Sequence, residues 1–273
     1  MIILAKKKLI LPTRKIVRTP RPCFKPWIWV PRKPTTGALA LDATGTESFV
    51  GTSPTSVNYN GFTMGAVSNG AFVVILILGS LSDNSVAMTW NVNQSPAQII
   101  KKDSPSSTGS VQLWGLVNPT AGNKTLAITG INAATADIYI DIISFSGVDQ
   151  TGGATTFYGA VSNNGTGTAM SAGSATTSSG DATVGAAILL VGGSITARSL
   201  TSLFEDGSGS ISEGAAQHNE GSASPAVTWT NNGASSPWAA AATSVKAAAA
   251  STVVFRRSLS AIGTRTGSRQ IHG

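Results

Sequence analysis

The 273-residue chain carries 19 Lys and Arg against 12 Asp and Glu, a formal net charge of +7, and 11% of its residues are charged. Because 41% of the residues are hydrophobic, the composition excludes an intrinsically disordered chain, which combines low hydrophobicity with high net charge. The single cysteine, Cys23, excludes an intramolecular disulfide framework and a cysteine-rich zinc site.

Residues 1–34 hold ten Lys or Arg, no Asp or Glu and six prolines. Proline removes a backbone donor and disfavours a helical conformation at the residue before it, so we predict an extended, basic anchoring arm. Aliphatic residues and tryptophans lie between the cations, which favours docking on a protein by strand pairing and pocket filling. The residues expected to contact the partner are Lys6, Lys7, Lys8, Arg14, Arg18, Arg21, Trp27, Ile28, Trp29 and Arg32. Phosphate neutralisation and base stacking make nucleic acid the weaker alternative partner, and a merely disordered tail is the third interpretation.

The start of the chain does not resemble a secretory signal. The cations Lys6–Lys8 interrupt the apolar start, and Pro12 and Arg14 follow closely, so no uninterrupted apolar core remains. The longest apolar run, Ala71–Leu78, is far shorter than the roughly 20 residues that span a bilayer. We therefore expect a soluble protein that is made inside a cell and has no membrane partner.

From Thr35 to Ser251 the chain alternates short apolar runs with Gly, Ser, Asn and Asp. Repeated short runs separated by turn residues are typical of an all-β sandwich or barrel. The length leaves open whether this body is one domain or two subdomains. The predicted strands are Ser48–Gly51, Phe62–Met64, Ala71–Leu78, Ser85–Val92, Ala97–Lys101, Val111–Val117, Lys124–Thr129, Asp137–Ser144, Ala182–Val191, Ser194–Leu203, Ala226–Thr230 and Ala239–Val245.

Two of the predicted strands differ in their pattern of apolar residues. Ala71–Leu78 (AFVVILIL) shows no alternation, which indicates a strand covered on both faces. In Asp137–Gly147 (DIYIDIISFSG) isoleucines alternate with Asp137, Tyr139 and Asp141. This alternation predicts a half-buried strand whose aspartates lie on the face away from the core.

Two pairs of segments are similar to each other in sequence. Ala71–Ser80 (AFVVILILGS) is similar to Ala186–Ser194 (AAILLVGGS), and Ala87–Asn91 (AMTWN) is similar to Ala226–Asn231 (AVTWTN). The spacings of the two pairs, 115 and 139 residues, do not share one period. This favours the reuse of similar strands over a tandem repeat.

No constellation of residues identifies an enzyme. His218 and His272 are the only histidines, and His218 lies in a polar stretch (EGAAQHNEGS) that is typical of a solvated loop. The chain has no G-x-S-x-G motif, and the glycine-rich Val161–Thr168 (VSNNGTGT) has no Walker lysine and is interpreted as a loop. Asp137 and Asp141 would lie about 13 Å apart along a strand, too far for an acid/base pair. We predict no catalytic residues and no cofactor.

Four aspartates are interpreted as turn residues whose side chains accept hydrogen bonds from nearby backbone amides. They are Asp42, Asp83, Asp149 and Asp181. A calcium site built from loop carboxylates and carbonyls stays open, although no D-x-D-x-D-G loop supports it.

Residues 252–273 form a second basic segment. From Lys246 to the end, the chain carries five cations and no acids, whereas residues 35–245 carry four cations and all twelve acids. An acidic body between two basic ends predicts that both ends are contact segments. The contact residues expected in this tail are Arg256, Arg257, Arg265 and Arg269.

Three stretches of the body carry a family resemblance: Thr89–Lys102, Val111–Thr129 and Ile138–Thr151. They resemble a β-sandwich module that recurs in bacteriophage and prophage virion proteins and in some bacterial surface proteins. In these stretches the tryptophans would fill the core, N-P-x-x-G would turn a hairpin, and Ser-Phe-Ser-Gly-Val would turn the chain out of its strand. The residues that carry the resemblance are Thr89, Trp90, Trp114, Leu116, Asn118, Pro119, Gly122, Thr125, Ser144, Phe145, Ser146, Gly147 and Val148.

The resemblance implies an antiparallel β-sandwich of jelly-roll type in a phage particle assembled in the host cytoplasm. It implies a virion structural protein, first of all a capsid decoration or cement protein that binds the major capsid protein or another virion protein and stabilises the phage head. A homo-oligomer in the particle is expected. The alternatives are a tail, collar or fibre component, or a carbohydrate-binding module that stacks sugars on Trp229, Trp238 or Tyr158. Core positions are the simpler interpretation of those two tryptophans.

Overall fold

The computed structural model describes residues 38–67, 69–79, 85–190, 194–206 and 212–249. These residues form an all-β structure in which the paired strands are antiparallel. The only helix in these ranges is the short 3-10 helix η1 (Gly153–Thr156), so no helix there is long and apolar enough to cross a membrane. The predicted class, all-β with antiparallel sheets, is confirmed.

Two five-stranded sheets form the centre of the body. The first large sheet has the order β1 (Ala40–Val50), β10 (Asp137–Ser146), β4 (Ala71–Gly79), β7 (Gly109–Val117) and β6 (Ala97–Asp103). The second large sheet has the order β11 (Phe157–Gly167), β18 (Ser236–Val245), β13 (Ala182–Leu190), β16 (Ser212–Glu220) and β15 (Thr201–Asp206).

Three smaller sheets complete the described part of the chain. The first small sheet has the order β2 (Ser56–Tyr59), β9 (Leu126–Thr129) and β5 (Ala87–Trp90). The second small sheet has the order β12 (Ala169–Ser174), β17 (Ala226–Asn231) and β14 (Ile195–Arg198). The strands β3 (Thr63–Met64) and β8 (Gly122–Asn123) pair with each other.

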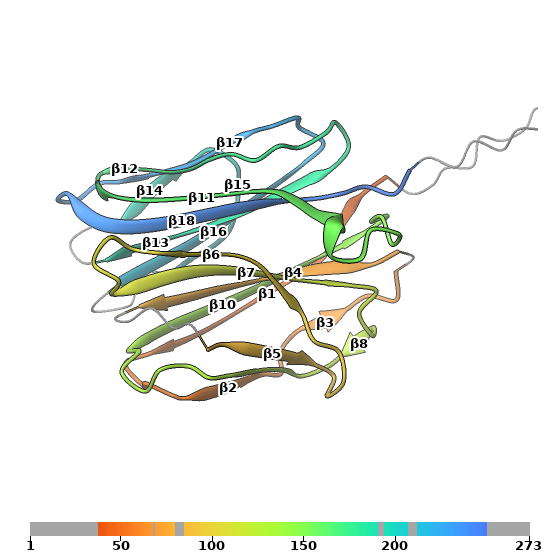
Figure 1. Cartoon of the computed structure of the whole chain (residues 1–273), viewed down its shortest axis with the longest axis horizontal. Helices are drawn as coiled ribbons and strands as arrows, with labels where there is room; N and C mark the ends of the chain where they lie inside the picture. Colours follow the sequence, from red (N-terminus) through yellow and green to blue (C-terminus); the bar gives the residue numbers. More distant parts are fainter. Residues whose placement is uncertain (1–37, 68, 80–84, 191–193, 207–211, 250–273) are drawn as a thin grey trace, which may run out of the picture. The chain divides into compact units, whose positions relative to one another are not determined.

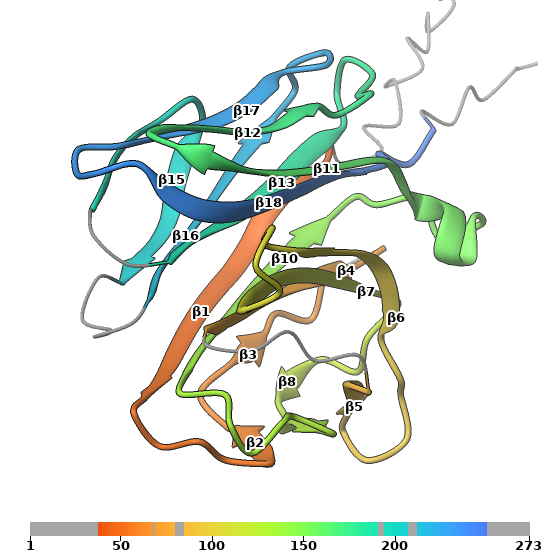
Figure 2. The same ribbon diagram turned by 60° about the vertical axis from the view of Figure 1, so that its left-hand side comes forward.

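The sheets pack in layers that are held together by three hydrophobic clusters (Figures 1 and 2). One cluster lies between the two large sheets and includes Ile75 of β4 and Ala186 of β13. A second joins the first large sheet to the first small sheet and contains Trp90. A third joins the second large sheet to the second small sheet and contains Trp229. Each large sheet is therefore covered on both faces.

The chain passes through the same strand order twice. With β3 and β8 set aside, β1 to β10 (the first repeat) and β11 to β18 (the second repeat) have identical sheet orders. Corresponding long strands have equal lengths: 11 residues in β1 and β11, nine in β4 and β13, and ten in β10 and β18. Bulges also recur near the start of β1 and β11 and of β6 and β15. The body therefore consists of two structural repeats.

The sequence comparison did not predict this structural repeat, because the spacing between corresponding strands is not constant. The start of β11 lies 117 residues after the start of β1, whereas the start of β18 lies 99 residues after the start of β10. Connections in the second repeat are shorter, so no single period exists. Of the two similar pairs of segments, the pair in β4 and β13 lies in corresponding strands, and the pair in β5 and β17 does not.

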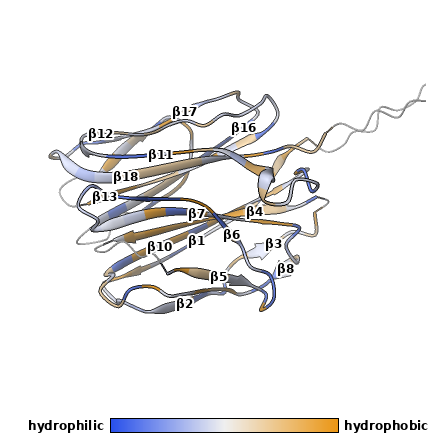
Figure 3. Ribbon diagram, viewed as in Figure 1, coloured by the Kyte–Doolittle hydropathy of each residue, from blue (hydrophilic) through white to orange (hydrophobic). Residues whose placement is uncertain are grey.

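The central strands show where burial was predicted correctly and where it was not. All residues of β4 are buried, as its unbroken apolar pattern predicts, and Figure 3 shows hydrophobic residues along β4 and β10. Asp137 and Asp141 are also buried, with 0% and 1% exposure, which corrects the prediction of a half-buried strand. Tyr139, from the same face, packs in the cluster between the large sheets. The face predicted to be solvated is covered by the second large sheet.

The second repeat contains the strands that sequence reasoning missed. Val161–Thr168 was interpreted as a loop, but Val161 to Gly167 lie in β11 and pair with β18. A Cβ at Gly165 would lie 2.8 Å from the Trp238 ring, so glycine is needed there because that indole covers the neighbouring strand. His218 lies in β16 and is 6% exposed, so the loop interpretation of that segment was also wrong.

Other boundaries differ from the predicted ones. The predicted strand Ser194–Leu203 is two strands, β14 and β15, which belong to different sheets. The strands β2 and β12 were not predicted. Both are short and polar and lie at the edge of a small sheet, where only one face needs apolar side chains.

The residues behind the family resemblance have mainly structural positions. Trp90 and Trp114 are buried in the same cluster, as expected for core tryptophans. β10 ends at Ser146, and Gly147 has φ +68°, so the chain leaves its strand at the expected place. Residues 118–122 do not close a hairpin, because β7 is followed by β8, and β8 pairs with β3.

Candidate functional site

Both basic segments join the body at one end. Ala40, at the start of β1, pairs with Ser146 at the end of β10. After β18, Ala247 forms a bridge with Val148, and Ala248 N donates to Gly147 O at 2.8 Å. The two ends of the described chain therefore lie on either side of the segment that follows β10, near η1 in Figures 1 and 2. We call this region, residues 38–41, 91–97, 118–122, 147–157 and 246–249, the exit end.

An ion pair fastens the chain where it leaves β18. Lys246 Nζ lies 2.9 Å from Asp149 Oδ2, and Asp149 Oδ1 accepts hydrogen bonds from Thr151 N and Oγ1 at 2.9 and 2.7 Å. The hydrogen bonds from Lys246 and then Thr151 lower the pKa of Asp149 from 3.8 to about 2. The same ion pair raises the pKa of Lys246. Asp149 is thus a turn residue, as predicted, that also holds the start of the C-terminal segment.

A second carboxylate holds the next residue of that segment. Asp181 Oδ1 accepts a hydrogen bond from Ala247 N at 2.7 Å, and Asp181 Oδ2 accepts one from the Tyr158 hydroxyl. Ser178 N donates to the Tyr158 oxygen at 3.0 Å. Burial, and then the hydrogen bond with Asp181, raise the pKa of Tyr158. These contacts fix the backbone at the exit of the C-terminal segment.

The remaining predicted turn aspartates have different outcomes. Asp42 lies inside β1, where Oδ2 accepts hydrogen bonds from Gly65 N at 3.0 Å and from Ser144 Oγ at 2.8 Å. Its partners are distant in sequence, so the prediction of a local turn was wrong there. Asp83 lies outside the described residues.

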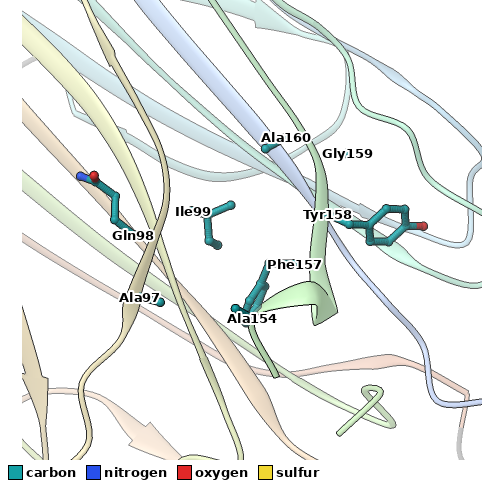
Figure 4. A pocket seen from close by; sticks show the side chains of 8 residues that line it. All are labelled: Ala97, Gln98, Ile99, Ala154, Phe157, Tyr158, Gly159 and Ala160. Carbon is teal, nitrogen blue, oxygen red and sulfur yellow. The ribbon is translucent and has the colours of Figure 1, made fainter. Parts of the chain in front are cut away.

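A groove opens at the exit end between the edge strands β6 and β11. It consists of two adjoining pockets of about 260 and 240 Å³, which share Ala97, Ala154 and Phe157. Figure 4 shows Ile99, Ala154 and Phe157 in the space between the strands, and the Gln98 and Tyr158 side chains directed away from it. None of the lining residues is charged.

Backbone irregularities create this groove. The β6–β7 register shifts between Gln98 and Ile100, and the β11–β18 register shifts between Tyr158 and Val161. Bulges of this kind bend an edge strand away from its regular path. Farther along, Asn164 Nδ2 donates to Asp103 O at 2.8 Å, so the two edges close together there. This hydrogen bond joins the two strand edges at the far end of β6, away from the exit end.

All the residues that the sequence predicts to contact a partner lie outside the described residues. Those of the basic arm lie outside the described residues: Lys6, Lys7, Lys8, Arg14, Arg18, Arg21, Trp27, Ile28, Trp29 and Arg32. Those of the C-terminal tail also lie outside them: Arg256, Arg257, Arg265 and Arg269. The structure shows the points where these segments join the body.

The aromatic residues considered for sugar stacking are not free platforms. Trp229 and Trp238 are 1% and 6% exposed and pack in the cluster of the second repeat, so their interpretation as core residues is confirmed. Tyr158 is partly exposed, but its hydroxyl is engaged with Asp181 and Ser178. Sugar stacking on the two tryptophans would require the core to open.

The titratable residues do not assemble into a metal centre in the described ranges. No group of three or more His, Cys, Asp or Glu side chains that could hold a metal ion occurs there. His218 Nδ1 lies 2.8 Å from Glu220 Oε1. Asp137 Oδ2 accepts a hydrogen bond from Ser212 Oγ at 3.1 Å, and Asp141 Oδ1 accepts one from Thr46 Oγ1 at 3.2 Å. The two aspartates thus have separate partners.

The sequence signal for the exit end was weak. The basic segments drew attention to the two ends of the chain, but nothing in the sequence indicated that they join the body side by side. Comparisons with protein-family models, with curated proteins and with solved structures give no match to this chain. The function of the chain is therefore argued from its residues and its geometry.

Proposed function

We propose that the chain is a virion structural protein, a capsid decoration or cement protein that binds a phage head through its terminal segments. The observation that carries this proposal is the shared exit of the two segments. Ala40 pairs with Ser146, and Ala247 bridges Val148, two residues farther along the same chain. Two basic segments that start side by side can grip one partner surface together, and the rest of the body then projects from it.

The distribution of charge supports a protein partner with an acidic surface. Residues 1–34 carry ten cations and residues 246–273 carry five, and neither segment contains an acid. The intervening residues 35–245 carry four cations and twelve acids. Opposite charge across an interface steers binding and fixes its orientation. An acidic lattice would attract the two basic segments and repel the acidic body.

We also propose that each repeat is a sandwich of the jelly-roll type. In each repeat the first and last of the eight strands are neighbours, as are the second and seventh and the third and sixth. This nested pairing is the pattern of a jelly roll, a fold of viral capsid and lectin domains. The fourth and fifth strands depart from it, because they lie in different sheets. The fold alone does not define the function.

Retention on particles tests the proposed function. Particles are purified from a phage whose gene for this chain has been deleted, and purified full-length protein or variants lacking residues 1–34 or 252–273 are added. We expect the full-length protein to co-sediment with the particles, the variant lacking residues 1–34 to be lost, and the other to bind more weakly. Unchanged retention of both variants, or no binding of the full-length chain, would overturn the proposal.

Two additions to this experiment distinguish the alternative locations and partners. Gold-labelled full-length protein seen by electron microscopy on the tail or collar would favour a tail component over a head decoration protein. Nuclease treatment of the particles before sedimentation distinguishes a nucleic-acid contact from a protein contact. We expect retention to survive the nuclease, because the apolar residues in the arm favour a protein surface.

A further inference from the structure

A hairpin tip at the exit end carries a fully exposed hydrophobic residue. Between β5 and β6 the chain turns through Asn91, Val92 and Asn93. Val92 is 92% exposed, and Leu41, at 42%, is the only other large hydrophobic residue exposed in the described ranges. Leu41 lies next to Ala40 at the start of β1. Both exposed hydrophobic residues therefore belong to the exit end.

The position of the tip follows from the strand pairing. Ala97, at the start of β6, pairs with Gly115 near the end of β7. The end of β7 in turn pairs with Ala71, and Ala71 pairs with Phe145 at the end of β10. Residues 91–96 thus precede β6 at the same end of the sheet where β10 ends and the terminal segments leave.

The backbone of Val92 is strained. Asn91 and Val92 have φ +47° and +60°, the left-handed region that L-residues avoid. Asparagine tolerates this conformation, but for a β-branched residue such as valine it is a true outlier. Glycine would adopt it without strain. Strained residues of this kind cluster at functional sites, where the surrounding structure holds them in place.

The surrounding contacts hold this turn firmly. Trp90 N donates to Gln94 O at 2.6 Å, and Gln94 N donates to Trp90 O at 3.0 Å. Gln94 Oε1 accepts a hydrogen bond from Thr120 N at 2.7 Å, and the Trp90 indole donates to Thr120 O at 3.0 Å. Trp90 itself is fully buried. The tip is therefore a rigid extension of the core, not a mobile loop that happens to carry a valine.

We infer that the tip at Asn91–Asn93 is a preformed knob that inserts Val92 into an apolar pocket on the protein surface that the basic segments grip. This inference rests on the proposed function and specifies the contact made by the body. Charge indicates the kind of partner surface. The tip is uncharged, and the segments that leave from the same end of the sheet carry only cations, so an apolar pocket with an acidic rim complements them. The neutral groove beside β6, whose lining includes Ser95, continues the apolar contact.

Replacement of Val92 tests the knob without damaging the fold. Val92→Gly and Val92→Asn both remove the apolar side chain and suit a left-handed backbone. Their melting temperatures should equal or exceed that of the parent chain. Because burial of a valine stabilises a complex, we expect each variant to bind the gene-deleted particles about tenfold more weakly in co-sedimentation titrations.

Ser107→Gly is the matched control. Ser107 also has a left-handed backbone, φ +51°, and lies in the turn that joins β6 to β7 at the opposite end of β6. Its replacement should leave particle binding unchanged. Equal loss of binding for Ser107→Gly and Val92→Gly would overturn the inference, since the effect would not depend on the exit end.

The outcomes separate the knob from the proposed function. If loss of residues 1–34 abolishes binding and Val92→Gly and Val92→Asn bind like the parent, the inference is overturned and the proposed function stands. If the parent chain does not bind particles, the proposed function fails and the inference with it. Sedimentation velocity without particles tests whether the knob instead contacts a second copy of this chain. If Val92→Gly dissociates a homo-oligomer and leaves particle binding unchanged, the knob contacts a second copy and the inference is overturned.

Discussion

The two repeats have one strand order but different side chains. The strand β4 reads AFVVILILG, and the corresponding β13 reads ATVGAAILL. Where the large sheets face each other, the strands of the first contribute one alanine to the cluster, whereas the strands of the second contribute five alanines beside larger residues. A Cβ at Gly214 of the second sheet would lie 3.0 Å from the Tyr139 ring of the first. The sheets therefore fit together by placing small residues of one opposite large residues of the other, as close-packed interiors require.

The facing residues show this division. On the first large sheet they include Ala71, Val73, Ile75, Ile77, Val111, Leu113, Tyr139, Ile143 and Phe145. On the second they include Phe157, Ala182, Val184, Ala186, Ile188, Leu190, Phe204, Ala216, Ala239, Ala241 and Val245. Truncation of a side chain in the first large sheet should therefore lower the free energy of unfolding more than truncation in the second.

Truncation of Ile75 should destabilise the body strongly. Ile75 is 1% exposed between the large sheets, and Ile→Ala leaves a cavity that costs about 3 kcal/mol of unfolding free energy. Ala186→Gly, in the facing sheet, loses one methyl group and should cost about 1 kcal/mol. Chemical denaturation measures both values. Equal losses would show that the two sheets share the packing evenly and would contradict the large-with-small interpretation.

Replacement of Asp141 should change how stability depends on pH. Asp141 faces the second repeat with Oδ2 unpartnered, and burial raises its pKa from 3.8 to about 7, opposed by hydrogen bonds from Thr46 and the Ile142 backbone. The folded state thus holds the proton more tightly than the unfolded state. Stability associated with this group is fully present below about pH 4 and is lost as the pH rises through about 7.

Asp141→Asn should remove this loss of stability at high pH, because the amide does not ionise. We expect the variant to be about 2 kcal/mol more stable than the parent at pH 8, less than the full pKa shift allows, because a buried amide also needs partners. At pH 4 the two proteins should differ little. Thermal unfolding between pH 4 and pH 8 measures the difference, and parallel stability curves for the two proteins would show that Asp141 does not titrate near neutrality.

Removal of Lys246 should have the smallest effect. Lys246→Met breaks the ion pair with Asp149, so the pKa of Asp149 should rise from about 2 toward its ordinary value. Because a lowered carboxyl pKa stabilises the folded state above the unfolded pKa, the melting temperature should fall slightly at pH 7 and match the parent near pH 2. A carboxyl titration by NMR measures the pKa. Lys124→Met serves as the control, because Lys124 forms no ion pair within the described part of the chain.

The pattern of side chains was informative in the first repeat and misleading in the second. The unbroken run in β4 and the buried Trp90 and Trp114 were predicted correctly because large apolar residues have few other stable positions. In β11 and β16, Gly, Ser, Asn and Ala indicate loops when taken alone. They form strands because neighbours such as Trp238 cover the small residues and supply the apolar contact.

The candidate site was predicted only in part. Charge counting identified two contact segments, and their composition indicated a protein partner. Three features could not be predicted: the groove, the contacts by which Asp149 and Asp181 hold the start of the C-terminal segment, and the exposed Val92. The groove and these contacts join residues from strands far apart in the sequence. The strained turn at Val92 is held by Trp90 and Gln94, both of which form hydrogen bonds with the distant Thr120.

By itself, the sequence determined that the body is an all-β structure with an apolar core, that it is acidic, and that its ends are basic. These properties depend on composition and on short-range alternation, which a strand imposes on its own residues. Only the tertiary structure decided that the strand order repeats, that Asp137 and Asp141 are buried, and that both basic segments leave at one end. The physical reason is that these features depend on which strands pair and which sheet faces meet. Small residues permit that close packing but leave no recognisable pattern in the sequence.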